Sequence, residues 1–522
     1  MAQANLIDTM PTDQTDGESQ PVESQPWLIQ VKKRFERQYK IQVQCSHSVT
    51  IYRVPKSIVA LKREAYVPQV VAFGPYHRNM NPQLSAMDEH KLEAVRRILT
   101  RLNNITINTL ITEVQQLEKE IRDCYEGPVD YSGETFAWMC TMDACFILEF
   151  LRTPKRRYDQ KNFSLVFQNA GHRNAISWEI MKDILKLENQ IPLFLLIRIL
   201  QLELRSRETA MSTLATILSH FDEFRGFPFS LEQSQKLGRK EQIKLRIEAH
   251  IKMGACHLLD LCRKIIKDFL TYPIVPVTPA PSTFECNVSS KCQTLGWTGS
   301  TNQWLRSNND HHSDCIKMGK CISTYFTSKQ KFGRNVDDGM SIASAKLLRS
   351  AGIRFRPGKI WFAKKSFRRS TLFLPQIKVE HSTETHLRNL MAFEECQSCG
   401  WYPEKTVILR FMLFVDYLID SEQDVALLRK EGIITTALGS NQEIACMFNN
   451  LCKGITVRKC DEFEKVVKRV RRHCRSRCSV WISQFRREHC SKPWYVVSLL
   501  AGMLILSLTA AQTFYAARNS SK

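Results

Sequence analysis

The sequence DILKLENQIPLFLLIRIL, residues Asp183–Leu200, is strongly apolar and predicts two helices that lie in the core. Pro192 cannot continue a helix from its N-terminal side, so we expect it to kink the helix or to begin a new one. Glu188, Asn189 and Gln190 interrupt the apolar run. We interpret them as a buried polar network rather than a binding site, because polar groups inside a core must find hydrogen-bond partners.

Further apolar segments with helical spacing lie on both sides of this stretch. Leu92, Val95, Leu99 and Leu102 recur on one predicted helix face. Other predicted helices cover residues 114–121, 142–152, 256–270, 341–352, 385–396, 407–419, 424–434 and 440–452. Alternating apolar residues at Ile353, Phe355, Leu372 and Leu374 predict short strands. The fold class we expect is therefore α+β and mainly α-helical, as one large helical domain with a few short strands.

The domain boundaries follow from changes in composition. The chain has 522 residues, 43% hydrophobic and 24% charged, which is typical of a folded globular protein. Residues 1–45 are interpreted as a disordered acidic N-terminus followed by a short helix; the first 26 contain five acidic residues and no lysine or arginine. The main domain covers 46–490, with a variable, partly disordered insertion at 273–338. Residues 494–517 form a separate apolar segment, and 518–522 a short tail.

This apolar segment, WYVVSLLAGMLILSLTAAQTFYAA, predicts a single C-terminal transmembrane helix. Its roughly 24 uncharged residues would extend ~36 Å as a helix, enough for a ~30 Å hydrocarbon core. Aromatic rings at its ends match the preference of such rings for membrane interfaces. The residues that we expect to form the anchor are Trp494, Tyr495, Leu499, Leu500, Leu504, Ile505, Leu506, Leu508, Phe514 and Tyr515.

Basic residues flank the predicted anchor mainly on its N-terminal side. They are Arg471, Arg472, Arg475, Arg477, Arg486, Arg487 and Lys492. Because positive charge stays on the cytoplasmic side of a membrane, this asymmetry predicts a tail-anchored, single-pass protein with its bulk in the cytosol. We favour the plasma membrane, and membrane lipid is an expected partner.

The formal net charge of +22 makes acidic partners plausible: phospholipid headgroups, nucleic acid or acidic proteins. Two basic clusters stand out, one in the region Arg354–Arg369 and one at Lys465–Arg477. A nucleic-acid binder would require the two clusters to merge into one groove with aromatic residues between them. The second cluster precedes the predicted anchor and suits anionic lipid better. We therefore expect no nucleic acid as a partner.

Motifs that carry catalysis or hold cofactors are missing from the sequence. It contains neither a G-x-S-x-G nucleophile elbow, a Gly-rich phosphate loop nor an HExxH zinc motif. The cysteine pairs, at 396 and 399 and within 286–321, lack the spacing of a zinc finger. We assign no catalytic, cofactor or metal residue. His77 and the Asp88–His90 cluster could act as acid or base. A turn at Gly74–Pro75, capping of the next helix by Asp88, and hydrogen bonds of His77 and His90 to backbone groups explain them better.

A set of motifs, in order along the chain, resembles the plant family catalogued as domain of unknown function 247 (DUF247, also UPF0481). The motifs include IYRVP (51–55), AYVPQVVAFGPYH (65–77), MDACFILEF (142–150), LENQIPLFLL (187–196) and HLLDLCR (257–263). They continue to residue 517, so the resemblance covers nearly the whole chain. GKIWFAKKSFRRSTLFLP, however, is basic where the family has an acidic and apolar stretch.

The resemblance implies a land-plant protein that is membrane-associated and mostly uncharacterised. Some members of the family lie at self-incompatibility loci of grasses, which suggests recognition or signalling. We therefore expect a non-enzymatic protein–protein recognition or signalling module that is tethered by its C-terminal helix and binds an unknown protein. The alternatives are an enzyme, a hydrolase or transferase, with an unrecognised pocket, and a nucleic-acid binder with a basic surface.

Overall fold

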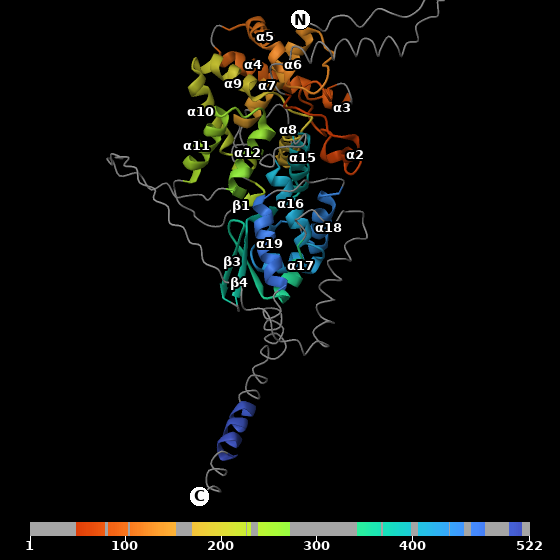
Figure 1. The fold of residues 1–522 in the computed structure, drawn as a ribbon. Helices are drawn as coiled ribbons and strands as arrows, with labels where there is room; N and C mark the ends of the chain where they lie inside the picture. Colours follow the sequence, from red (N-terminus) through yellow and green to blue (C-terminus); the bar gives the residue numbers. More distant parts are fainter. Residues whose placement is uncertain are drawn as a thin grey trace, which may run out of the picture.

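The computed structural model describes residues 49–78, 82–102, 105–152, 170–225, 227–230, 239–271, 342–366, 369–397, 406–437, 439–453, 461–475 and 501–513. The short helix predicted before residue 45 and the insertion predicted at 273–338 lie outside these residues. Helices dominate the described chain and strands are few and short, as the sequence predicted. Figure 1 shows the first helices at one end of the molecule and the strands beside the last helices at the other.

The N-terminal half consists of helices. These are α2 (Lys56–Val59), the 3₁₀ helix η1 (Arg63–Ala65), α3 (Pro82–Ser85), α4 (Asp88–Arg101), α5 (Ile107–Gln116), α6 (Glu118–Asp123), α7 (Gly133–Arg152), α8 (Ala170–Ile184), α9 (Leu193–Leu204), α10 (Arg207–Leu218), η2 (Asp222–Arg225), α11 (Arg239–Lys252) and α12 (Leu258–Thr271). Helix α7 is almost entirely buried from Phe136 to Leu151. It lies at the centre of this half, where α4, α5 and α9 pack against it.

The C-terminal half adds two small sheets to further helices. The helices are α14 (Ala345–Ser350), α15 (Thr383–Gln397), α16 (Val407–Leu418), α17 (Glu422–Lys430), α18 (Asn441–Leu451) and α19 (Asp461–Arg475). In one sheet, β5 (Gln376–Val379) lies between an antiparallel β1 (Phe229–Ser230) and a parallel β6 (Ile434–Thr436). In the other, β4 (Arg369–Leu374) lies between a parallel β2 (Ile353–Pro357) and an antiparallel β3 (Trp361–Ser366).

The apolar stretch around Pro192 folds as two helices, α8 and α9, with residues 185–192 between them. Pro192 is the N-cap of α9, with a φ of −61° and a ψ of 136° in the extended region. The missing N–H of proline is harmless at the start of a helix, where no intrahelical acceptor awaits it. The prediction that Pro192 begins a new helix is confirmed.

One predicted helix face is confirmed for Val95, Leu99 and Leu102 but not for Leu92. In α4 the buried residues are Lys91, Ala94, Val95 and Ile98, whereas Leu92 is 39% exposed. Lys91 occupies a core position because its ammonium has a buried partner: its Nζ lies 2.7 Å from Oδ1 of Asp143 on α7. A charge that is paired and hydrogen-bonded can occupy a core position that an apolar count would give to leucine.

The predicted transmembrane helix at 494–517 is also wrong. Among the described residues, no helix is both long and apolar enough to cross a membrane. Residues 501–513 are helical and include the exposed Leu504, Ile505, Leu506 and Leu508. The other predicted anchor residues lie outside the described chain. The single-pass, tail-anchored topology and the membrane localisation predicted from this helix are therefore not supported.

Candidate functional site

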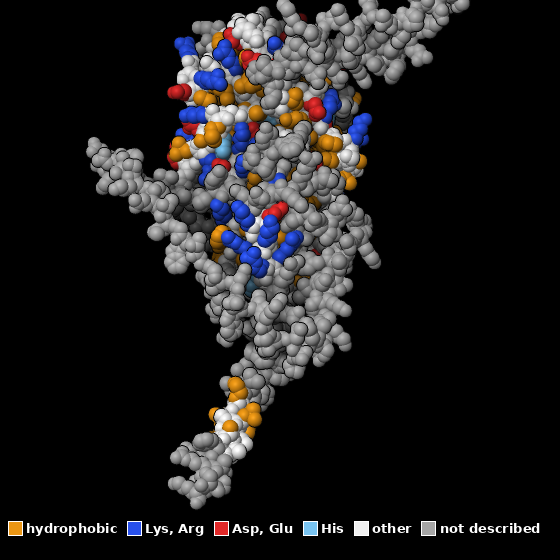
Figure 2. Space-filling model, in the orientation of Figure 1, with side chains coloured by type: hydrophobic (Ala, Val, Ile, Leu, Met, Phe, Trp, Pro, Cys, Tyr) orange, Lys and Arg blue, Asp and Glu red, His pale blue; other side chains and the backbone are white. Residues whose placement is uncertain are grey.

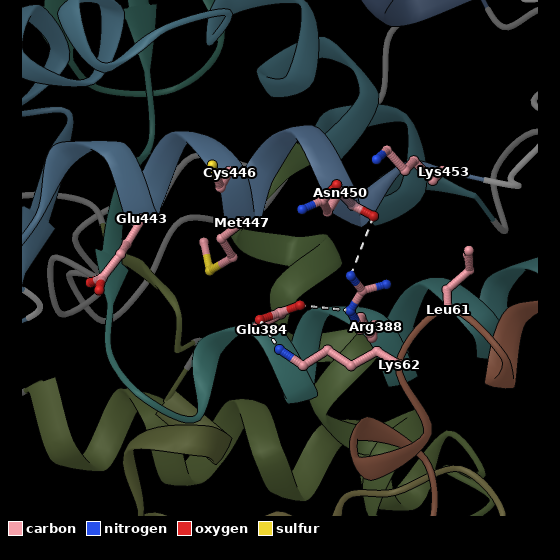
Figure 3. A pocket seen from close by; sticks show the side chains of 9 residues that line it. All are labelled: Leu61, Lys62, Glu384, Arg388, Glu443, Cys446, Met447, Asn450 and Lys453. Carbon is pink, nitrogen blue, oxygen red and sulfur yellow. Dashed lines mark hydrogen bonds and ion pairs between the residues drawn. The ribbon is translucent and has the colours of Figure 1, made fainter. Parts of the chain in front are cut away.

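A groove lies between α15, α18 and the segment after α2. Its volume is about 450 Å³, within the range of small-ligand and short-peptide sites. Figure 3 shows the side chains of α18 facing those of α15 and of the segment after α2. The lining residues are Leu61, Lys62, Glu384, Arg388, Glu443, Cys446, Met447, Asn450 and Lys453.

Three charged side chains form the floor of the groove. Lys62 Nζ lies 2.6 Å from Oε2 of Glu384, and Nε of Arg388 donates to Oε1 of the same carboxylate at 2.9 Å. Arg388 also donates to the backbone carbonyl of Asn450 at 3.3 Å, which joins α15 to the end of α18 (Figure 3). Because Arg388 is buried, the floor is held in one arrangement before any partner binds.

Tyr66 is buried next to Arg388. Burial raises the pKa of its phenol, and the neighbouring Arg388 opposes this rise. The phenol therefore stays protonated at physiological pH and can donate a hydrogen bond. Arg388 therefore interacts with both the neutral phenol of Tyr66 and the carboxylate of Glu384, which fixes its position further.

The rim of the groove combines apolar side chains with two charges. Leu61 is 45% exposed, Cys446 is exposed and Met447 is half-buried. Glu443 and Lys453 are both exposed and lie at opposite ends of the row of side chains along α18 (Figure 3). An apolar centre bordered by charges is the composition of a protein-binding surface, where apolar contact gives affinity and charge gives orientation.

The sequence of α18 explains why these residues point outward. Ile444, Ala445, Phe448 and Leu451 recur at helical spacing and are buried. Cys446, Met447 and Asn450 fall between them and face the groove. The helix begins at its N-cap Ser440, whose hydroxyl oxygen accepts the N–H of Glu443 at 3.5 Å. The buried residues of α18 thus hold its opposite side toward the groove, where it forms one wall.

The segment from Ala65 to Arg78 contains the polar residues that the sequence singled out near Gly74–Pro75. It crosses the interior without forming a strand, so its backbone needs other hydrogen-bond partners. Asp183 accepts the N–H groups of Gln69, Val70 and Val71, at 2.7 to 3.1 Å. These bonds make Asp183 a structural residue of the core.

The amide of Asn189 completes this support. Its Oδ1 accepts the N–H of Phe73 at 2.6 Å, and its Nδ2 donates to the carbonyl of Val71 at 3.0 Å. Gln190 donates to the carbonyl of Ile184 and accepts the N–H of Leu259. The prediction that Glu188, Asn189 and Gln190 belong to a buried polar network is confirmed for these two amides.

His77 and Asp88 are positioned differently from the sequence prediction. His77 is buried, and its Nε2 lies 3.0 Å from Oε2 of Glu188, so its partner is a carboxylate rather than a backbone group. Asp88 is the first residue of α4, whose N-cap is Met87, and its carboxylate pairs with Arg78 at 3.0 Å. The prediction that Asp88 caps the helix is therefore wrong, and its charge instead ties the helix start to the segment before it.

A second buried network joins α12 to α15. His257 is fully buried, and its Nε2 donates to the carbonyl oxygen of Thr50 at 3.0 Å. Burial lowers the pKa of His257 to about 4. Burial alone would raise the pKa of Asp260, but Arg263 and Lys264 outweigh it and hold the pKa at about 2. Asp260 Oδ1 accepts two hydrogen bonds from Arg263. His257 and Arg263 also contact the ring of Phe393 on α15. These groups therefore hold α12 against α15 and do not line the groove.

Glu394 on α15 lies in the same region and is fully buried. Its Oε2 accepts the N–H of Leu409 at 2.9 Å, which joins α15 to α16. Burial raises the pKa of Glu394 from 4.5 to about 7, against the opposing effects of Arg263 and the backbone N–H groups. The folded protein therefore holds this carboxyl group protonated where an exposed glutamate would be ionised.

We expect Glu394→Gln to remove one component of the pH dependence of stability. Between pH 4.5 and 7 the unfolded chain ionises Glu394 while the folded chain keeps it protonated, so the wild type loses stability as the pH rises. A pKa difference of about 2.5 corresponds to a loss on the order of 3 kcal/mol. Urea titrations at several pH values measure the unfolding free energies of both proteins. The free energy of Glu394→Gln minus that of the wild type should rise by this amount between pH 4.5 and pH 7. A difference that does not change with pH would contradict the assignment.

Arg354 and Arg356 lie on one face of the sheet β2–β4–β3, and His473 of α19 packs against the other. Ser370 and Phe362 face α19, since His473 of α19 lies 3.3 Å from the Ser370 hydroxyl and packs on the Phe362 ring. In β2, Ile353 and Phe355 are buried, and Ile353 is in register with Ser370. Arg354 and Arg356 alternate with them and are exposed on the other face. Trp361 is in register with Phe373 and hence with Arg356, so the ring that Arg469 of α19 approaches lies on this same face.

Figure 2 shows lysine and arginine side chains gathered over α19. Lys465, Lys468, Arg469 and Arg472 are exposed there, and Lys468 pairs with Glu464 at 2.8 Å. The guanidinium of Arg469 lies 5.0 Å from the ring centroid of Trp361, which is 53% exposed. Arg471 and the backbone of Arg475 also belong to this helix, whereas Arg477, Arg486, Arg487 and Lys492 lie outside the described residues.

Within the described ranges, no three metal-ligating side chains converge. Cys396 is described, but Cys399 and the cysteines of 286–321 lie outside these ranges. The groove itself was not predicted from the sequence. Leu61 and Lys62 are more than 300 positions from Glu384 and Glu443, and no motif links such distant surface residues. The exposed side of the helix predicted at 440–452 was the one sequence feature that could have indicated part of the groove.

Comparisons with known proteins place the chain among plant sequences. The family DUF247, described as a plant protein of unknown function, matches residues 51–508. One UPF0481 protein of Arabidopsis thaliana is 27% identical over 529 residues, with 94% of each chain covered. A second UPF0481 protein of the same plant is 26% identical over 477 residues, with 89% of this chain and 86% of the relative covered. No solved structure matches the chain.

Proposed function

This chain belongs to the plant family DUF247, and from that premise we propose that it is a non-enzymatic protein-recognition module whose groove between α15 and α18 binds a short segment of a partner protein. The observation that carries the proposal is the groove's composition. Leu61 and Met447 supply apolar contact, and the buried Arg388 holds a charged floor beneath them. Preformed grooves of this kind reduce the entropy that a protein loses on binding.

The lining residues favour binding over catalysis. Cys446 is the one thiol among them, and the nine residues include no histidine that could activate it. Glu384 is engaged by both Lys62 and Arg388, so it is not placed to act as a general base. These features suit recognition of a polypeptide, in which side chains contact a partner without exchanging bonds with it.

The mixed charges of the groove support the expectation that nucleic acid is not the partner. A strand of nucleic acid needs a continuous basic path along its phosphates. The groove, by contrast, contains both signs of charge, which suits a polypeptide better than a polyanion.

The Met447→Glu substitution tests the proposal. A random peptide library is selected against the immobilised full-length protein, and the dissociation constants of the selected peptides are measured by fluorescence anisotropy. A carboxylate in the apolar centre should weaken their binding at least 30-fold, because burying an unpaired charge costs several kcal/mol.

The matched control is Met253→Glu, since Met253 is 66% exposed and lies outside the groove. This variant should bind the selected peptides as the wild type does. Peptides that bind both variants equally well would place the recognition site elsewhere and would refute the proposed function of the groove.

A further inference from the structure

The two charged residues at the ends of the groove, Glu443 and Lys453, form no ion pair with the charged residues of its floor. The floor carboxylate, Glu384, is shared between Lys62 and Arg388. Glu443 and Lys453 have no side-chain ion pair with any described residue. Both side chains are exposed and border the pocket. They are therefore available to a partner.

Glu443 and Lys453 are held at a defined separation by α18. Glu443 lies in the first turn of the helix, and Lys453 follows its C-cap residue, Cys452. Ten positions at the helical rise of 1.5 Å correspond to about 15 Å. An extended peptide covers that distance in roughly four or five residues at ~3.3 Å each. The apolar side chain of Met447 lies between the two charges.

From this geometry we infer that the groove selects a short extended segment of a partner protein, with a basic residue toward Glu443, an acidic residue toward Lys453 and an apolar residue between them. The inference rests on the proposed function and names the class of partner. The volume of about 450 Å³ favours a short extended segment, since a helix with its side chains is ~10–12 Å across. The acidic first 26 residues of the chain lack a lysine or arginine and cannot supply the basic end.

Three peptide libraries test the inference with the full-length protein. Each places a central leucine, methionine or phenylalanine between two charged positions four or five residues apart. One library carries one basic and one acidic position, the second carries two acidic positions, and the third two basic positions. This design does not depend on the direction in which a peptide lies in the groove.

The wild type should prefer the mixed library. Glu443→Lys should shift the preference to the doubly acidic library, and Lys453→Glu should shift it to the doubly basic one. Exposed ion pairs contribute up to about 1 kcal/mol, so each charge should change the dissociation constant by about threefold to fivefold at low ionic strength. The preference should weaken as salt is added.

Both charges also suit the dipole of α18, negative near its N-terminus and positive near its C-terminus. A role restricted to helix stability would lower the melting temperature of both variants and leave the order of the three libraries unchanged, and that result would overturn the inference. Binding that Met447→Glu abolishes but that neither charge reversal redirects would refute the charge selection alone.

Peptides that bind without any sensitivity to Met447→Glu would refute the proposed function itself. Analytical ultracentrifugation of the same variants tests whether a second copy of this chain occupies the groove. If Met447→Glu dissociates an oligomer of the wild type, the groove is an interface between copies of this chain, and the inferred partner segment is wrong.

Discussion

Replacing Asp183 by alanine should destabilise the protein by about 3–5 kcal/mol. The carboxylate is buried and accepts the N–H groups of Gln69, Val70 and Val71. Its Oδ1 also lies 2.9 Å from Nζ of Lys186, whose side chain is 2% exposed. Alanine would leave three amides without this acceptor and a buried ammonium without its counter-ion, and each loss costs the desolvation of the group.

Urea unfolding followed by circular dichroism measures this effect. Asp222→Ala is the matched control, because Asp222 forms an exposed pair with Arg225 at 3.2 Å and its side chain is 48% exposed. Loss of an exposed pair should change the unfolding free energy by less than about 1 kcal/mol. Asp183→Asn keeps one acceptor oxygen and should fall between the two. If Asp183→Ala unfolds within 1 kcal/mol of the wild type, the segment from 65 to 78 is held by other contacts.

Replacing Gly74 by alanine should cost at least about 3 kcal/mol. The residue has a φ of +66°, and a Cβ atom there would lie 2.8 Å from Oη of Tyr125 and 2.9 Å from the carbonyl oxygen of Gln190. The positive φ alone costs roughly 1–2 kcal/mol for a residue with a side chain. The clash adds to this because the Tyr125 hydroxyl is bonded to the Gln190 carbonyl at 3.0 Å, so neither atom can move without breaking that bond.

Gly127→Ala separates the two contributions. Gly127 has a φ of +83°, but no atom lies within 4 Å of the position its Cβ would occupy. This variant should lose only the conformational part, on the order of 1–2 kcal/mol. Melting temperatures from calorimetry should therefore rank the wild type above Gly127→Ala and Gly127→Ala well above Gly74→Ala. Equal losses at the two positions would mean that the space around Gly74 can relax.

The helices and strands could be predicted from the sequence because their signals are local. The periodic apolar residues of α7, α12 and α16 mark buried helices, and alternation at Ile353–Phe355 marks a strand. The helix start at Pro192 could be predicted because a proline restricts only its own backbone and that of adjacent residues, which is also a local signal.

Features that depend on distant partners were missed. Lys91 is buried because Asp143 lies opposite it on another helix, and no pattern within α4 reveals that partner. The groove joins Leu61 and Lys62 to residues of α15 and α18, which the fold alone brings together. The transmembrane prediction used only the composition of 494–517, and no helix in the described part of the chain is long and apolar enough to cross a membrane.

The location of a bound peptide tests the central claim most directly. A selected peptide with a benzophenone in place of its apolar residue is photo-crosslinked to the full-length protein, and mass spectrometry identifies the modified residues. We expect crosslinks at Met447 and Leu61, and their loss when unlabelled peptide is added in excess. Competable crosslinks confined to residues outside the groove would contradict the proposal that this groove is the recognition site.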